Sequence, residues 1–129
     1  MSSIRSFRDL IGYQKASAGA RQVFQLNKRF PKDERYSLTD QIRRSSRAVG
    51  AMIAEAWVRR RYIAVWENKL DEALAEASET QAWLDSALDS EYITVAEHRQ
   101  FDDEYQQIGA ILHTLIEKSD TFCFPPRRR

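Results

Sequence analysis

The sequence is poor in the residues that interrupt or cross-link a chain. Its 129 residues include four glycines, three prolines and one cysteine, Cys123. So few helix breakers favour long helices over many short strands, and a lone cysteine excludes an internal disulfide. No run of about 18 consecutive apolar residues is present, the length needed to cross a bilayer. The segment MSSIRSFRDL also lacks the apolar run of a secretion signal, so we expect a cytoplasmic protein without a membrane partner.

Motifs typical of catalysis are missing as well. No glycine-rich loop suited to a nucleotide phosphate occurs, and the single cysteine has no CxxC partner for a metal or redox role. A di-iron bundle needs Glu-x-x-His on two helices. Here Val95 stands three residues before His98, and Ala110 stands three residues before His113. These absences predict a non-enzymatic protein with no cofactor and no metal site.

What the chain does have is a sharp division of charge beneath a formal net charge of +1. Residues 1–61 hold 14 Lys and Arg against 5 Asp and Glu, which gives +9. Residues 62–124 hold 3 against 14, which gives −11, and Arg127, Arg128 and Arg129 add +3. Such a division indicates an anionic partner, a charge-matched assembly, or both.

Apolar periodicity divides the chain into four helical segments. The first covers residues 7–29 and stops before Pro31. The second follows Ser37, a plausible N-cap with Asp40 three residues on, a variant of the capping box. The third ends near Asp89, and Thr94 with Glu97 makes a capping box for the fourth.

Each segment places its apolar residues at intervals of three and four, which keeps them on one helix face. Connections of roughly 4 to 8 residues favour antiparallel neighbours. We therefore predict an all-α fold, an antiparallel up-down-up-down four-helix bundle in one domain over residues 1–120, with an extended basic tail over residues 121–129. The predicted core stripes are Phe7, Leu10, Ile11, Ala20, Val23, Phe24 and Leu26; Leu38, Ile42, Ser45, Val49, Ile53 and Ala56; Trp66, Leu70, Ala73, Leu74, Ala77, Gln81, Leu84 and Leu88; and Phe101, Tyr105, Ile108, Leu112 and Leu115.

Two stretches of the chain resemble a known family. The first comprises Phe30-Pro31, Glu34-Arg35-Tyr36-Ser37-Leu38, Gln41-Ile42-Arg43-Arg44-Ser45-Ser46 and Ile53-Ala54-Glu55-Ala56. The second is Ala77-Ser78-Glu79-Thr80-Gln81-Ala82-Trp83-Leu84, followed by Ala87-Leu88-Asp89 and Tyr92-Ile93. Their order and separation resemble the four helix bundle protein family, which includes the 23S rRNA-intervening sequence proteins and is similar to the accessory variability determinant of diversity-generating retroelements.

That resemblance carries expectations of its own. It implies an antiparallel four-helix bundle, assembly into a ring that is a pentamer in known members, and binding of RNA or DNA in the retroelement members. It also leaves open a protein partner such as a reverse transcriptase. The chain departs from the family pattern Asn-Ile-Ala-Glu-Gly, because Met52 and Ala56 replace the Asn and the Gly. Without that Gly the second helix is expected to run on towards Trp57 and Arg59.

Candidate sites lie on the outward face of the second segment. Arg43, Arg44 and Arg47 suit a phosphate-binding patch, because guanidinium groups make forked hydrogen bonds to anionic oxygens. The alternative is a solvated face, or ion pairs with the acidic third segment. Further along the same face, Ala51, Ala54 and Val58 form a smooth surface that suits an oligomer interface, or simply a solvated face of good helix formers.

A second basic cluster, Arg59, Arg60 and Arg61, follows that segment. It extends the candidate nucleic-acid surface, although cations that end a helix also complement its dipole. Trp57 and Tyr62 are the aromatic residues closest to these arginines and the best placed to stack on bases, although such rings more often fill a core. The sequence thus predicts a non-enzymatic oligomeric adaptor that binds nucleic acid through its basic first half. The alternative is a structural self-assembling module without that binding.

Overall fold

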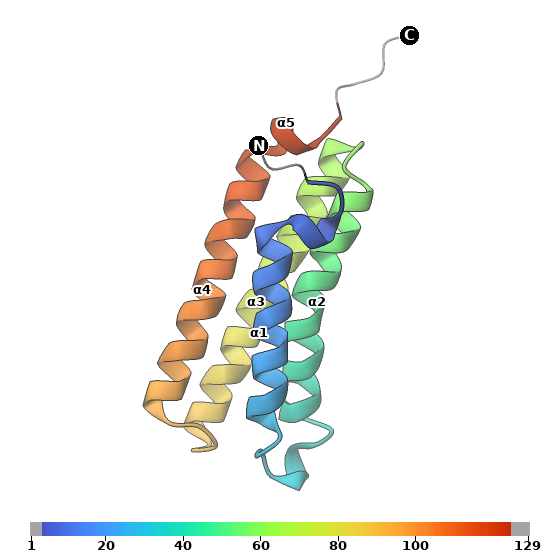
Figure 1. Ribbon diagram of the computed structural model, residues 1–129. Helices are drawn as coiled ribbons and strands as arrows, with labels where there is room; N and C mark the ends of the chain where they lie inside the picture. Colours follow the sequence, from blue (N-terminus) through green and yellow to red (C-terminus); the bar gives the residue numbers. More distant parts are fainter. Residues whose placement is uncertain (1–3, 125–129) are drawn as a thin grey trace.

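The computed structural model describes residues 4–124 and is all-α, as predicted: within that range it contains no strand. Four long helices form a bundle, namely α1 (Ile11–Asn27), α2 (Leu38–Val58), α3 (Ile63–Asp89) and α4 (Val95–Glu117) (Figure 1). The short elements are the 3-10 helices η1 (Phe7–Asp9) and η2 (Lys32–Glu34) and the one-turn helix α5 (Ser119–Phe122). Among the described helices, none has both the length and the apolar character that a membrane span requires.

Side-chain contacts show how neighbouring helices run. On α2 and α3, Arg44 pairs with Glu79 while Glu55 pairs with Lys69, so residue numbers rise on one helix as they fall on the other. The two helices are therefore antiparallel. The same holds for the other three pairs of neighbouring helices. The contacts are Tyr13 with Gly50 and Asn27 with Arg43 between α1 and α2, and Asp85 with His98 and Gln81 with Asp102 between α3 and α4. Between α1 and α4 they are Gly12 with Leu115 and Gly19 with Tyr105.

The predicted apolar stripes of α2 and α4 are buried throughout, which confirms the periodicity that defined them. Trp66, Leu70, Ala73, Ala77 and Leu84 of α3 are buried as well. Other predicted members of the first and third stripes are only half-buried, namely Phe7, Ala20, Phe24, Leu74, Gln81 and Leu88. Gly19 of α1 faces Tyr105 of α4, where an added Cβ would stand 3.1 Å from the Tyr105 hydroxyl. That distance is shorter than ordinary van der Waals contact, so a larger residue at position 19 would have to displace the Tyr105 side chain.

The first predicted helix is wrong in its boundaries. Ser6 and Asp9 form a capping box around η1, and the extended backbone of Leu10 separates η1 from α1. Leu10 turns inward, whereas Ile11, predicted as core, is 56% exposed. The polar cap thus ends the first turn early, and the helix restarts in a different register.

Two of the predicted helix starts have different outcomes. The capping box of Thr94 and Glu97 is confirmed, with the Glu97 amide donating to Thr94 Oγ1 at 3.1 Å and the Thr94 amide donating to Glu97 Oε1 at 2.9 Å. The one predicted for Ser37 and Asp40 is wrong. Ser37 makes no side-chain cap, because its hydroxyl donates backwards to Glu34 Oε1 at 2.5 Å.

The ends of α2 and α3 agree with the sequence. α2 continues past Ala56 to Val58, as expected where the family glycine is missing. α3 ends at Asp89 in a Schellman motif, in which the Tyr92 amide donates to Ala87 O at 2.9 Å. Glu91 has the left-handed φ of 61° that this motif requires.

The start of the predicted tail is helical rather than extended. Thr121 and Phe122 belong to α5, and the Phe122 ring stacks on Trp66 with 5.5 Å between ring centres. The core therefore extends under the first residues of that segment. Arg127, Arg128 and Arg129 lie outside the described residues.

Candidate nucleic-acid interface

Arg44, one of the six predicted nucleic-acid-binding arginines, faces α3. Its guanidinium pairs with Glu76 at 3.2 Å and also with Glu79, and these hydrogen bonds raise its pKa. Glu79 in turn accepts a hydrogen bond from the Trp83 indole at 3.1 Å. At Arg44 the structure thus matches the ion-pairing alternative.

Arg43 and Arg47 turn the other way, towards α1. The Arg43 Nε donates to Asn27 Oδ1 at 2.8 Å, and Asn27 is almost completely buried. The guanidinium carbons of Arg43 and Arg47 lie 4.8 and 5.5 Å from the centre of the Phe24 ring. Lys28 Nζ lies 4.8 Å from the same centre, so one half-buried ring gathers three cations.

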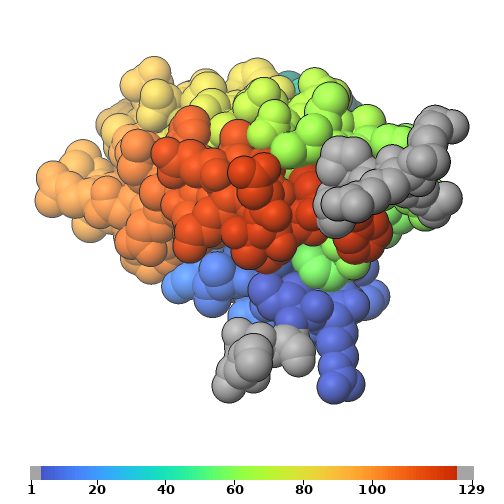
Figure 2. Space-filling view, turned by 90° about the horizontal axis from the view of Figure 1, so that it is seen from above, coloured from blue at the N-terminus to red at the C-terminus, as the bar shows by residue number. Residues whose placement is uncertain are grey.

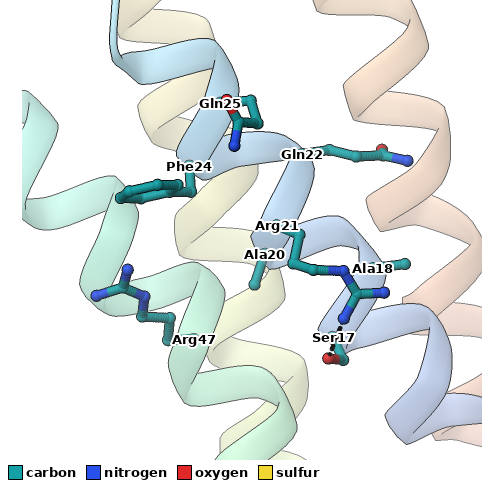
Figure 3. Close-up of a pocket in the computed structure, with 8 residues that line it drawn as sticks. All are labelled: Ser17, Ala18, Ala20, Arg21, Gln22, Phe24, Gln25 and Arg47. Atoms are coloured by element: carbon teal, nitrogen blue, oxygen red, sulfur yellow. Dashed lines mark hydrogen bonds between the residues drawn. The ribbon is translucent and has the colours of Figure 1, made fainter.

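A surface groove runs beside this ring between α1 and α2. Its volume is about 720 Å³, and Figure 3 shows Phe24 and Arg47 facing each other across it while Arg21 lies further along α1. The Arg21 Nη1 donates to Ser17 Oγ at 2.9 Å, which holds that side chain along the helix. Lys28 and Arg43 approach the same ring without lining the groove. We call the groove residues Arg21, Phe24 and Arg47, together with Lys28 and Arg43, the Phe24 groove.

The Phe24 groove lacks compensating charge. Among residues 4–124, none of its four cations forms an ion pair. The negative face of an aromatic ring attracts cations, but Phe24 is neutral and leaves their net charge unbalanced. Such an arrangement suits an anion that approaches from solvent.

Phe24, Lys28 and Arg21 were not among the residues predicted from the sequence as nucleic-acid-binding. The spacing of Phe24 and Lys28 was the available signal, because residues four apart lie on one helix face. Nothing in the sequence indicated that Arg43 would cross to the same ring.

Comparison with known proteins supports a family assignment. A family model described as 23S rRNA-intervening sequence protein matches residues 8–114. The chain belongs to this family. It is also similar to a crystal structure of a protein of unknown function from the S23 ribosomal protein family of Bacteroides thetaiotaomicron, at 30% identity and a TM-score of 0.75. That match covers 83% of this chain and 96% of the other, whereas no curated protein matches.

The family assignment does not by itself supply an activity. Neither the family description nor the name of the Bacteroides structure specifies an enzymatic reaction or a ligand. The Phe24 groove lies within the part of this family member that the family model matches.

The second predicted cluster, Arg59 to Arg61, is divided by the turn between α2 and α3. Arg60 lies over Trp57, with its guanidinium carbon 3.7 Å from the ring centre and 4.8 Å from the centre of the Phe124 ring. Trp57 is buried under this contact, so its face is not open to a base. Arg59 and Arg61 are exposed, and the Arg61 guanidinium carbon lies 5.9 Å from the centre of the exposed Tyr62 ring.

The residues predicted for an oligomer interface follow one side of α2. Ala51 is exposed, Ala54 is half-buried, and Val58 is 72% exposed. Nothing within the described chain covers Val58. This side of α2 is therefore smooth and open to a neighbouring molecule.

One cluster of metal-ligand types lies between α3 and α4. Asp85, His98 and Asp102 each place one ligand atom within 4.8 Å of the others. His98 Nε2 is hydrogen-bonded to Asp85 Oδ1 at 2.7 Å, and Gln81 Nε2 donates to Asp102 Oδ1 at 3.1 Å. Contacts between the two helices account for this cluster.

Proposed function

We propose that this family member is a non-enzymatic oligomeric adaptor, an antiparallel up-down-up-down bundle that binds RNA or DNA through the Phe24 groove. One observation carries the proposal: Lys28, Arg43 and Arg47 gather around Phe24 without a carboxylate partner in the described chain. Phosphate oxygens accept forked hydrogen bonds from guanidinium groups, and their binding releases counterions from the nucleic acid.

The rest of the bundle supports this orientation. α3 and α4 carry most of the acidic residues, with 14 Asp and Glu against 3 Lys and Arg over residues 62–124. A phosphate backbone is repelled by that side and attracted to the Phe24 groove. The nucleic acid would therefore run along α1 and α2, on the side of the bundle away from most of the acidic charge.

Assembly of identical copies is the second part of the proposal. Ala51, Ala54 and Val58 offer small side chains that allow a neighbouring helix to approach closely. A basic half that meets the acidic half of the next copy makes a heterologous contact, which closes into a ring when the rotation allows. We propose a ring, a pentamer by resemblance to the family.

Fluorescence anisotropy with labelled single-stranded RNA and DNA tests the nucleic-acid part. Affinity should fall by at least tenfold between about 50 and 200 mM salt. The double variant Lys28→Ala/Arg47→Ala should bind about tenfold more weakly and reduce the salt slope by roughly one unit per cation removed. Both side chains lie at the surface, and the Arg43 hydrogen bond to buried Asn27 is left intact.

Arg44→Ala is the matched control, because Arg44 lies on the same helix and is already paired with Glu76 and Glu79. It should change the affinity less than twofold. If neither RNA nor DNA binds at low salt, or if Arg44→Ala weakens binding as much as the double variant, the nucleic-acid part of the proposal is wrong.

A purely structural self-assembling module is the second candidate, favoured by the exposure of Val58 beside Ala51 and Ala54. Light scattering separates assembly from nucleic-acid binding. Ala54→Arg should lower the molar mass, because a long cation cannot be accommodated in a close helix contact. A wild-type monomer at tens of micromolar would exclude the ring.

A further inference from the structure

Large apolar side chains are exposed at the end of the bundle where α2 meets α3. Tyr62 is 59% exposed, Ile63 45% and Phe124 51%. Figure 2 looks onto this end, where the α2–α3 turn (green) and α5 (red) lie beside each other. The nucleic-acid proposal uses none of these three residues.

These side chains line a groove of about 850 Å³, which we call the end groove. Tyr62, Ile63 and Ala64 come from the start of α3, and Cys123 and Phe124 follow α5. A groove of this size can hold several side chains of a docked peptide, and an exposed apolar concavity of this kind often marks a protein contact.

The end groove has a preformed wall. The Arg60 guanidinium lies between the Trp57 and Phe124 rings, and Arg60 Nη1 donates to Trp57 O at 2.8 Å. Two residues earlier, Phe122 stacks on buried Trp66. Phe124 is thus positioned by contacts that reach the core, and little of the wall has to be ordered when a partner binds.

Charge is distributed unevenly around the end groove. Arg61 lines the side formed by the α2–α3 turn, Arg59 is exposed two residues earlier, and neither pairs with a carboxylate in the described part of the chain. Asp120 of α5 lies on the opposite side. A partner with acidic residues along one flank would meet Arg61 with those residues and keep them away from Asp120.

We propose that the end groove docks an amphipathic helix of another protein, with large aliphatic side chains on one face and acidic residues on the flank that meets Arg61. The aliphatic side chains pack between Ile63 and Phe124, as in other helix-in-groove complexes. A phosphate backbone fits less well, because Asp120 repels it and Ile63 and Ala64 offer it no hydrogen bond from their side chains.

A designed peptide tests this proposal on the full chain. The probe is a fluorescently labelled helix of about 16 residues, with leucines at positions i, i+3, i+4 and i+7 and glutamates elsewhere. A matched peptide carries lysines in place of the glutamates. We expect the acidic peptide to bind at least about tenfold more tightly than the basic one at low salt.

Variants then locate the binding site. Tyr62→Glu should weaken the acidic peptide about tenfold, and Arg61→Glu should remove the preference for the acidic peptide over the basic one. Tyr36→Glu is the control, because Tyr36 is 84% exposed at the opposite end of the bundle. RNA binding should stay unchanged in Tyr62→Glu, so this test is independent of the Phe24 groove.

Four outcomes would overturn the proposal. The acidic peptide binds no more tightly than the basic one, or Tyr62→Glu and Tyr36→Glu have equal effects. Tyr62→Glu lowers the molar mass by light scattering, which would assign the end groove to a second copy of this chain. RNA displaces the acidic peptide from Lys28→Ala/Arg47→Ala as effectively as from the wild type, which would assign the end groove to nucleic acid.

Discussion

The two flanks of α2 differ in whether their cations form ion pairs. On the flank that faces α3, Arg44 is neutralised by Glu76 and Glu79, and Ser45 and Thr80 share a buried hydrogen bond of 2.8 Å between their hydroxyl oxygens. On the flank that faces α1, the cations around Phe24 form no ion pair with a carboxylate of residues 4–124. The α2–α3 seam is therefore a structural contact, and the Phe24 groove is a surface open to a ligand.

Helix geometry explains the difference. Successive residues turn by about 100°, so Arg43 and Arg47, four residues apart, lie on one side while Arg44 points about 100° away from Arg43. Consecutive arginines can therefore have unrelated roles, and a basic run cannot be assigned to one face without its neighbours.

The largest effect that would sharpen this comparison is on stability. Leu84→Ala, in the fully buried α3 core, should lower the free energy of unfolding by about 3 kcal/mol because it leaves a cavity. Phe24→Ala, on a half-buried ring, should lower it by only about 1 kcal/mol. Urea unfolding followed by circular dichroism measures both values. Equal losses would make Phe24 a core residue rather than part of an open surface.

The hydroxyl pair of the seam comes next. Thr80→Val keeps the shape of the side chain but removes its hydrogen bonds to Ser45 and to Glu76 O, and should cost about 1 to 2 kcal/mol. Thr114→Val is the control, since the Thr114 hydroxyl bonds Ala110 O on an exposed part of α4; it should cost less than about 0.5 kcal/mol. If Thr80→Val left the free energy of unfolding unchanged, the buried hydroxyl pair would not contribute to the stability of the α2–α3 contact.

The paired and unpaired arginines should differ in stability at low salt. Arg44→Gln should lower the free energy of unfolding by up to about 1 kcal/mol, because its ion pairs are partly exposed. This loss should vanish near 1 M salt, where the Debye length is about 3 Å. Arg47→Gln should change the free energy of unfolding by less than about 0.5 kcal/mol at either salt concentration, because the lost cation–π contact with Phe24 is offset by weaker repulsion from Lys28 and Arg43. If Arg47→Gln were the more destabilising variant, the comparison would fail.

The smallest effect concerns pH at the end of α1. Hydrogen bonds from Arg29 and from the Thr94 backbone amide lower the pKa of Glu97 below its ordinary value of 4.5. The unfolded carboxylate therefore takes up its proton first as the pH falls. The stability that Glu97 contributes is fully present above about pH 4.5 and is lost as the pH falls through the lower, folded pKa.

We expect this contribution to be a few tenths of a kcal/mol, as for other exposed ion pairs. Urea unfolding at about pH 6 and about pH 3 brackets this titration. Between the two pH values, Glu97→Gln should lose less free energy of unfolding than wild type. Asp71→Asn, at an exposed residue without an ion pair in the described chain, should behave as wild type. An unchanged pH dependence in Glu97→Gln would contradict the assignment.

Much of the fold could be predicted because it depends on local periodicity. The stripes of α2 and α4 and the Thr94 capping box are local patterns, and all are confirmed. The break at Leu10 was missed, because the Ser6 cap competes with a helix that periodicity alone would extend. The capping box predicted at Ser37 was wrong for a similar reason, since the Ser37 hydroxyl donates to Glu34 in the preceding turn.

The candidate site was less accessible to sequence reasoning. The basic residues of α2 were visible, but their partners lie far away in sequence: Arg44 meets Glu79, and Arg43 meets Asn27. Tertiary packing decides which arginine is neutralised, and one sequence without its fold does not encode that choice in any local pattern.

The placement of the tryptophans makes the protein its own optical reporter. Trp57 lies beneath Arg60 next to the end groove, and Trp83 is hydrogen-bonded to Glu79 in the seam. No tryptophan lines the groove beside Phe24. A docked helix should therefore shift the intrinsic emission through Trp57, and rupture of the seam should shift it through Trp83. RNA bound at the Phe24 groove should leave the emission wavelength nearly unchanged, so one fluorescence spectrum distinguishes which face is occupied.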